Sequence, residues 1–186
     1  QCFRNRNILV VSLVLMAGAA GRGQGINAPY IVPHFVNDFG LDVTRAAWLY
    51  TVLQAGGLVG PLAWGWLSDR FNRAHTIQLS LLLSALSTLW LGWQTGVTPW
   101  LIANLVLYGT VVTSRQTLTQ ALISDIADEK ILDAAFSLYY FIGFLSAPFW
   151  TLLTGWLMEK YGFGVAFSAI STSYLLGMTL LFLLRE

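Results

Sequence analysis

The charged residues of this chain are confined almost entirely to short turns between long apolar stretches. Each apolar stretch has close to the ~20 residues that an α-helix needs to cross the hydrocarbon core of a bilayer, and such runs are too long for strands. Because the turns are short, neighbouring helices are expected to be antiparallel. The pattern predicts an all-α, polytopic membrane protein with six transmembrane helices in one domain, residues 1–186. The predicted spans are residues 8–36, 46–67, 76–93, 100–124, 134–158 and 163–184.

Composition excludes several other classes of protein. Charged residues make up 10% of the chain, whereas a soluble domain carries roughly 25%, so a soluble enzyme is excluded and contact with membrane lipid is expected. The net charge of +1 offers no basic face to a nucleic acid, so no nucleic-acid partner is expected. The single cysteine, Cys2, excludes a multi-cysteine metal site, and neither a metal nor a cofactor is expected.

The distribution of Lys and Arg between the turns predicts the orientation of the chain. The positive-inside rule places the side that is richer in basic residues in the cytoplasm. Both chain ends are therefore expected to be cytoplasmic, in a plasma (inner) membrane. The richer side carries Arg4, Arg6, Arg70, Arg73, Lys130 and Arg185, and the poorer side carries Arg45 and Lys160.

Two turns that lie 90 positions apart share one pattern. Residues 65–72 read GWLSDRFN and residues 155–162 read GWLMEKYG, and Pro61 and Pro148 lie upstream at similar depths in their spans. The chain is therefore predicted to consist of two related three-helix units, about 1–94 and 95–186. Because three is odd, the two units have opposite membrane orientations. Such an inverted 3+3 repeat is typical of one half of a secondary transporter.

The first of these turns resembles the signature of the major facilitator superfamily, G-x-L-(A/S)-D-R-(aromatic)-G-R-(R/K), over residues 65–74. Asn72 stands where glycine is usual, and Ala74 stands where a basic residue is usual. Since Asn tolerates a positive φ, the turn is expected to survive the first change. Residues 147–167 resemble the fifth or eleventh helix of the family and the turn that follows it.

The resemblance implies half of a twelve-helix transporter, whose partner is the other six-helix half. The weakened signature and the absence of an initiator Met favour the C-terminal half, with the N-terminal half as the alternative. The resemblance also implies that the signature turn is a conformational latch, which stabilises one conformer by pairing with another helix of the same half. The latch positions are Gly65, Asp69, Arg70 and Arg73. The alternative is a solvated turn that only fixes topology.

Two basic residues, Arg22 and Arg115, fall inside predicted spans, where no acidic residue is available to pair with them. An arginine in the membrane costs at least ~2.5 kcal/mol and normally faces a cavity or a partner. The spans that carry them correspond to cavity-lining helices of the family, and arginine suits the capture of a carboxylate or phosphate. They predict a site for a small organic anion. Alternatively, Arg22 pairs with backbone carbonyls and Arg115 with an acid of the other half.

Further polar side chains are candidates for the same substrate cavity. The glycines and prolines of the first span allow its backbone to bend there and to coordinate a ligand. Any of these side chains could instead hydrogen-bond another helix, and which of the two tyrosines in the fifth span faces inward is left open. His34, near the outer end of the first span, is a candidate for titration. The candidate cavity residues are Gln24, Asn27, Tyr30, Gln54, Thr119, Tyr139 and Tyr140.

The sequence predicts a secondary active transporter that moves a small solute by alternating access. One alternative is a complete six-helix protein that dimerises into a transporter or channel. An intramembrane enzyme is less favoured because His34 and His75 lie on opposite sides of the membrane and no acids cluster within a span, so a catalytic constellation is lacking.

Overall fold

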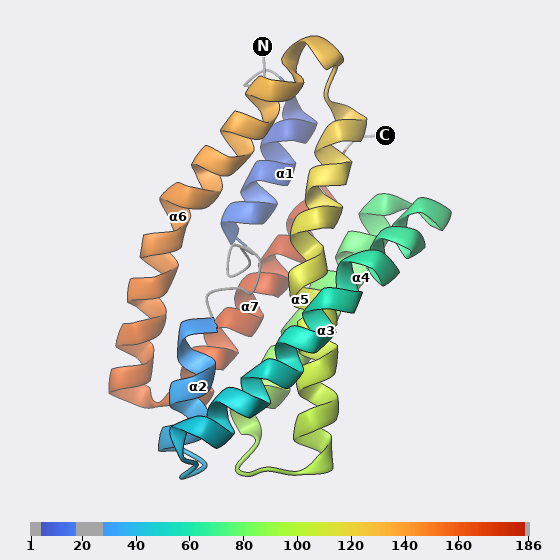
Figure 1. Ribbon diagram of the computed structural model, residues 1–186. Coiled ribbons are helices and arrows are strands. Elements are labelled where there is room, and N and C mark those ends of the chain that lie inside the picture. The colour runs from blue at the N-terminus through green and yellow to red at the C-terminus, as the bar shows by residue number, and fades with distance from the viewer. Residues whose placement is uncertain (1–4, 18–27, 185–186) are drawn as a thin grey trace.

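The computed structural model describes residues 5–184 apart from residues 18–27, and these described residues contain helices and turns but no strand. The all-helical class is therefore confirmed. The helices are α1 (Arg6–Ala17), α2 (Ala28–Asn37), α3 (Val43–Arg70), α4 (Arg73–Trp93), α5 (Pro99–Ile126), a short 3-10 helix η2 (Glu129–Ile131), α6 (Leu132–Tyr161) and α7 (Phe163–Leu181), as Figure 1 shows.

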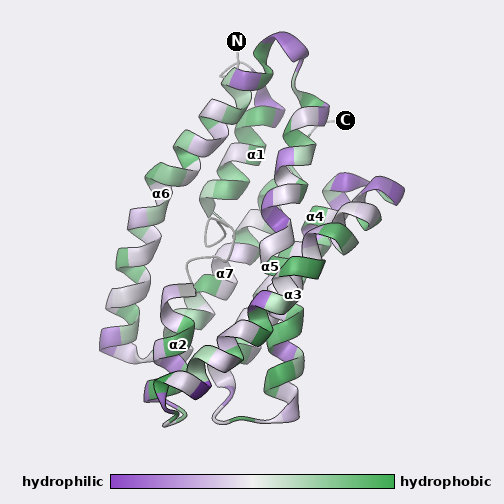
Figure 2. Cartoon of the chain, viewed as in Figure 1, coloured by the Kyte–Doolittle hydropathy of each residue, from purple (hydrophilic) through white to green (hydrophobic). Residues whose placement is uncertain are grey.

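The long helices run between two ends of the molecule. At one end, the start of α1, the α3–α4 turn and the ends of α5 and α7 line a common pocket, to which Asn7, Arg73, Ile126 and Phe182 contribute. At the opposite end, the ring of His34 in α2 contacts the Leu91 carbonyl near the end of α4 and the Phe163 ring at the start of α7. Hydrophilic residues are concentrated in the turns (Figure 2). The antiparallel arrangement agrees with the short turns of the sequence.

Four helical segments are long and apolar enough to cross a membrane: α3, α4, residues 129–161 with α6, and α7. The α5 helix is as long as α3 but carries Asn104, Arg115 and Gln120. The predicted first span is represented by α1 and α2, which lie on either side of residues 18–27. The count of six spans and the inverted 3+3 repeat therefore remain predictions.

The closest helix contact joins α3 to α5 through glycines. A Cβ added to Gly56 would lie 2.6 Å from the Val106 carbonyl oxygen, and one added to Gly109 would overlap the Leu53 carbonyl oxygen. Because glycine has no side chain, the two backbones approach to a distance that no other residue permits. Small residues are the usual means of bringing membrane helices together, since lipid supplies no hydrophobic driving force between them.

The second extensive contact joins α4 to α7, with hydroxyl and amide groups in the interface. The Ser171 hydroxyl of α7 donates to the Ala85 carbonyl of α4 at 2.8 Å, and the Asn104 amide of α5 donates to the Ser87 carbonyl at 3.0 Å. Buried polar groups need such partners because the surrounding side chains and lipid offer none. The α4 helix is thus held between α5 and α7.

The helices extend further into the predicted turns than the apolar pattern indicated. The α3 helix continues through Asp69 and Arg70, so these residues lie in its last turn and not beyond its end. Arg70 is favourably placed there because the carboxyl end of a helix carries partial negative charge. Asn72 has a φ of −61° and accepts a hydrogen bond from the His75 backbone N–H at 3.2 Å. The turn therefore accommodates Asn72 without a positive φ, since this residue caps the start of α4 with its side chain.

Candidate functional site

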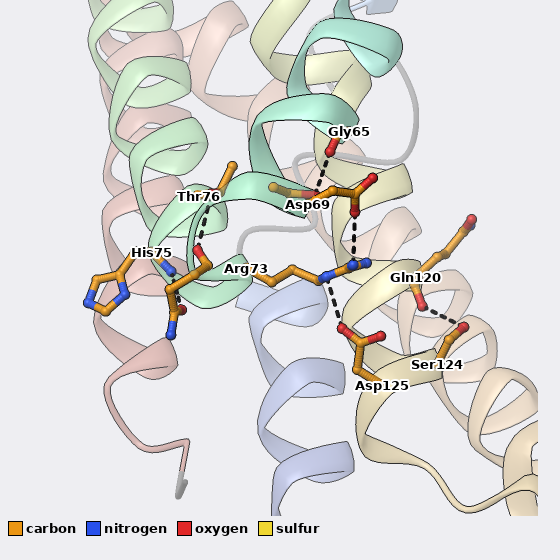
Figure 3. Close-up of polar contacts among 10 residues, drawn as sticks. Gly65, Asp69, Arg73, His75, Thr76, Gln120, Ser124 and Asp125 are labelled. Carbon is orange, nitrogen blue, oxygen red and sulfur yellow. Dashed lines mark hydrogen bonds and ion pairs between the residues drawn. The ribbon is translucent and has the colours of Figure 1, made fainter.

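The signature turn forms an ionic network with the end of α5 (Figure 3). The Arg73 guanidinium lies 3.0 Å from Asp69 Oδ1 and 2.9 Å from Asp125 Oδ2. Asp69 lies in the last turn of α3, Arg73 begins α4 and Asp125 lies in the last turn of α5, so one arginine links three helices. Arg73 is only 24% exposed while both carboxylates are more exposed. The network is therefore partly shielded, which makes its ion pairs stronger than those of a fully solvated turn.

The two other proposed latch residues lie outside this ionic network. The Arg70 guanidinium lies over the ring of Trp66, 4.2 Å from its centroid, one turn earlier in α3. Gly65 accepts a hydrogen bond from the Ser68 hydroxyl at 2.9 Å, and a Cβ placed on it would meet no other atom within 4 Å. In this conformation, the link to another helix therefore runs through Asp69 and Arg73, and Gly65 faces open space.

Replacing Arg73 with Gln should destabilise the protein by roughly 1–2 kcal/mol, because two carboxylates lose a partly buried partner. Thermal unfolding of the full-length protein in detergent measures the loss. The matched control is Arg45→Gln, which removes an equal charge from the exposed Arg45–Asp42 pair and should change stability by less than about 0.5 kcal/mol. Equal losses in the two variants would mean that the signature turn is simply a solvated turn.

Arg115 is the most unusual residue of the helix interior. Its side chain is 3% exposed, and neither terminal guanidinium nitrogen has a hydrogen-bond partner among the described residues. The guanidinium carbon lies 4.7 Å from the centroid of the Tyr174 ring in α7, which offers a cation–π contact. The side chain thus points from α5 toward α7, and its terminal N–H groups have no acceptor among the described residues. A buried charge without a partner is costly, so a complementary anion would gain considerably from binding there.

Hydroxyl groups continue this polar region along α5 toward α6. The Thr119 hydroxyl lies 2.6 Å from the hydroxyl of Tyr139, and one position further along each helix Gln120 donates to the hydroxyl of Tyr140, also at 2.6 Å. Tyr139 is buried and Tyr140 is half-buried, and both hydroxyls face α5. The two tyrosines therefore do not divide into one inward and one outward residue, as the sequence alternatives had assumed.

Gln54 and Tyr30, two further predicted cavity residues, take part in contacts that do not include Arg115. Gln54 lines a groove of about 300 Å³ with Thr51 and Thr113, and its buried Oε1 has no partner among the described residues. The Tyr30 hydroxyl donates to the Thr151 carbonyl at 2.8 Å and so joins α2 to α6. Arg22, Gln24 and Asn27 lie outside the described residues. The structure thus brings Thr119 and Tyr139 together and places Gln54 on a separate face, between α3 and α5.

His34 occupies a buried position between helices. Its Nδ1 lies 2.9 Å from Asp38 Oδ2 and its Nε2 lies 3.3 Å from the Leu91 carbonyl oxygen. Four phenylalanine rings surround it, those of Phe35, Phe39, Phe163 and Phe167. The residue holds α2 against α4 and α7, and its titration remains a prediction.

Sequence reasoning missed three contributors to these sites. Asp125 was not among the candidate residues, because its position opposite Arg73 follows only from the packing of α5 beside the α3–α4 turn. Tyr174 and Gln120 gave no signal, because tyrosine and glutamine are ordinary residues of membrane helices. In the part of the chain that the structure describes, no group of three His, Cys, Asp or Glu is placed to hold a metal ion.

Comparison with known protein families gives one match over nearly the whole chain. Residues 8–186 match the model of the Major Facilitator Superfamily. The monocarboxylate transporter 12-B of Danio rerio is 27% identical over 95% of this chain and 40% of its own length. The gallate transporter of Pseudomonas putida is 27% identical over 67% of this chain and 28% of its own length. The arabinose-proton symporter of Escherichia coli is 28% identical over 73% of this chain and 29% of its own length. The chain therefore spans well under half the length of these relatives.

Solved structures show the same fold. The POT family transporter PepTSo superposes with a TM-score of 0.83 at 17% identity, over 96% of this chain and 37% of that one. A structure from a study of substrate recognition in proton-dependent oligopeptide transporters also superposes with a TM-score of 0.83, at 21% identity over 97% of this chain and 42% of that one. At these identities the likeness concerns the fold alone.

Proposed function

The chain belongs to the major facilitator superfamily, and from this premise we propose that it forms one six-helix half of a secondary active transporter for a small organic anion. The observation that carries the proposal is Arg115, a buried arginine whose terminal nitrogens have no partner among the described residues. Transport proceeds by alternating access, in which this half moves against its partner around a site near the middle of the membrane.

The anionic substrate class rests on the chemistry of the Arg115 region. A guanidinium presents parallel N–H donors that fit the two oxygens of a carboxylate, and burial strengthens such a pair. The hydroxyl of Thr119, one turn further along α5, and that of Tyr139 in α6 provide neutral polar groups beside the charge. The names of two relatives refer to monocarboxylates and to gallate, both carboxylates. Arg22 is the second proposed anion ligand, with Gln24, Asn27, Tyr30, Gln54 and Tyr140 as further cavity residues.

The latch role of the signature turn rests on the Asp69–Arg73–Asp125 network. Ion pairs at partly exposed positions contribute about 1 kcal/mol each, which is enough to shift an equilibrium between two conformers of similar free energy. We assign Asp69 and Arg73 to stabilising the conformer described above, with Gly65 and Arg70 supporting the turn. The chain is proposed to be the C-terminal half, with both ends cytoplasmic in the plasma membrane, and to work with the other half and with lipid, without enzymatic activity or a cofactor.

The proposal is tested by uptake assays on the full-length protein with Arg115→Gln. Uptake of a monocarboxylate or of gallate should fall at least about tenfold, the equivalent of ~1.4 kcal/mol, because the substrate loses its charged partner. Uptake of a neutral sugar, if the protein carries one, should change by less than about twofold. The control is Lys160→Gln, which removes the same charge at a helix end. Equal losses for charged and neutral solutes would contradict the anion proposal.

A further inference from the structure

Pro61 interrupts the backbone hydrogen bonding of α3 well inside the helix. Proline has no backbone N–H, so the carbonyl of the residue four positions earlier, Gly57, receives no hydrogen bond from within the helix. In a membrane no water replaces that donor, and an unpaired carbonyl is costly there. A proline is therefore tolerated at such a position when a neighbouring helix supplies a donor.

The α5 helix supplies this donor through Thr113. The Thr113 hydroxyl donates to the Gly57 carbonyl at 3.3 Å and shares its proton with the Gly109 carbonyl of its own helix at 2.6 Å. The Gly109 carbonyl lies four residues before Thr113, so the α-helical ladder of α5 already provides it with a backbone N–H. The Gly57 carbonyl has no such alternative and depends on the hydroxyl. The longer, shared bond is thus the weaker of the two, and it breaks first when α3 moves away from α5.

The two segments of α3 on either side of Pro61 are held differently. The first segment, residues 43–60, is fixed to α5 by close backbone approaches such as that at Gly56. The second segment, residues 62–70, shows more of its surface, since Leu62 is 76% exposed and Trp66 is 57% exposed. Interlocked backbones resist separation more strongly than exposed side chains do, so the second segment is the freer of the two.

The second segment is linked to α5 at its far end. The Asp69–Arg73–Asp125 network provides this link. Ser68 is buried, but its hydroxyl donates to a carbonyl of α3 itself, and Trp64 packs against the hydrophobic core through apolar contact. Release of the network therefore leaves the second segment without a polar link to α5 among the described residues.

We propose that Pro61 is the hinge on which the second segment and the signature turn move when the latch opens, and that Thr113 holds this hinge in the conformer described above. Helices bend at proline because no hydrogen bond to the preceding turn resists the opening there. The proposal rests on the latch role assigned to Asp69 and Arg73. It goes beyond that role by specifying which part of α3 moves and which part stays on α5.

Hydrogen exchange of the full-length protein in detergent, followed by mass spectrometry, tests the role of Thr113. Thr113→Val keeps the shape of the side chain and removes the donor, so exchange in residues 62–70 should rise about threefold to tenfold, the range expected for one hydrogen bond. Pro61→Ala restores a backbone N–H for the Gly57 carbonyl. In that background Thr113→Val should change the exchange by less than about twofold, because the donor is no longer needed.

The matched control is Thr110→Val, because the Thr110 hydroxyl bonds to the Leu107 carbonyl of its own helix at 2.7 Å. This variant should leave the exchange of α3 unchanged. An equal effect of Thr113→Val with and without Pro61, or no effect in wild type, would overturn the proposal.

Arg73→Gln tests where α3 bends. Loss of the network should raise the exchange of residues 62–70 by about fivefold or more and that of residues 43–60 by less than about twofold. An even rise along the whole of α3 would contradict a hinge at Pro61. No change in either segment would overturn the latch role of Arg73 itself, on which the comparison of the Thr113 variants does not depend. Neither measurement requires a substrate.

Discussion

Replacing Gly109 with Ala should disrupt the packing of α3 on α5 and lower the free energy of unfolding by about 3 kcal/mol or more. The added methyl group overlaps the carbonyl oxygen of Leu53, a backbone atom that cannot rotate away. The two helices would have to separate, and the neighbouring close approaches at Gly56 and Gly60 would be lost with them. Thermal unfolding of the full-length protein, with size-exclusion chromatography to detect aggregation, measures the effect.

The matched control makes the same substitution at Gly65. This glycine also lies inside α3, but a Cβ there meets nothing within 4 Å. Since alanine favours a helix over glycine, Gly65→Ala should raise stability by about 0.5–1 kcal/mol. Comparable unfolding temperatures for the two variants would show that the α3–α5 contact is looser than described.

Replacing Arg115 with Met should stabilise the protein by roughly 1–4 kcal/mol and abolish anion transport. Methionine keeps the unbranched stem of the side chain and removes a buried charge that has no ionic partner among the described residues. The lost cation–π contact with Tyr174 offsets part of this gain. Thermal unfolding of the substrate-free protein measures the change in stability, and uptake of a carboxylate measures the loss of transport.

The sign of this stability change separates two roles of Arg115. If the arginine is held by an acid of the other half, Arg115→Met leaves that acid buried and unpaired, and stability falls by several kcal/mol. If the arginine is reserved for a substrate, stability rises, and an added carboxylate raises the unfolding temperature of wild type but not of the variant. Arg115→Lys keeps the charge and should retain most of the low stability of wild type.

The helical class and the positions of the long helices could be predicted from the sequence, because the spacing of apolar stretches follows directly from bilayer thickness. Helix ends were less predictable. Asp69 and Arg70 are polar and read as turn residues, yet α3 continues through them, since the end of a helix at the membrane surface tolerates charge. Asn72 was interpreted through the conformation that glycine would adopt there, whereas its side chain provides the N-cap.

The sequence indicated some of the residues that form the candidate sites, but not which side chains contact each other there. An arginine inside an apolar stretch is conspicuous in any sequence, so Arg115 was found. Its contact with Tyr174 depends on α7 lying beside α5, which no local pattern encodes. The same holds for Arg73, whose partner Asp125 is more than fifty residues away. Such pairings come from helix packing and become visible only when the helices are placed in space.

The pairing of α3 with α5 and of α4 with α7 has a consequence for how the chain is made. The α3 and α4 helices each pack most extensively on a helix that is synthesised later, with at least one other helix between them in the chain. When α3 leaves the ribosome, the glycines that will contact α5 are uncovered. The Ala85 carbonyl of α4 likewise lacks the Ser171 hydroxyl until α7, the last helix described, has been made. Assembly by successive hairpins is therefore ruled out for these contacts. A nascent chain stopped after α6 should expose the α4 surface to chaperones and quality-control proteases.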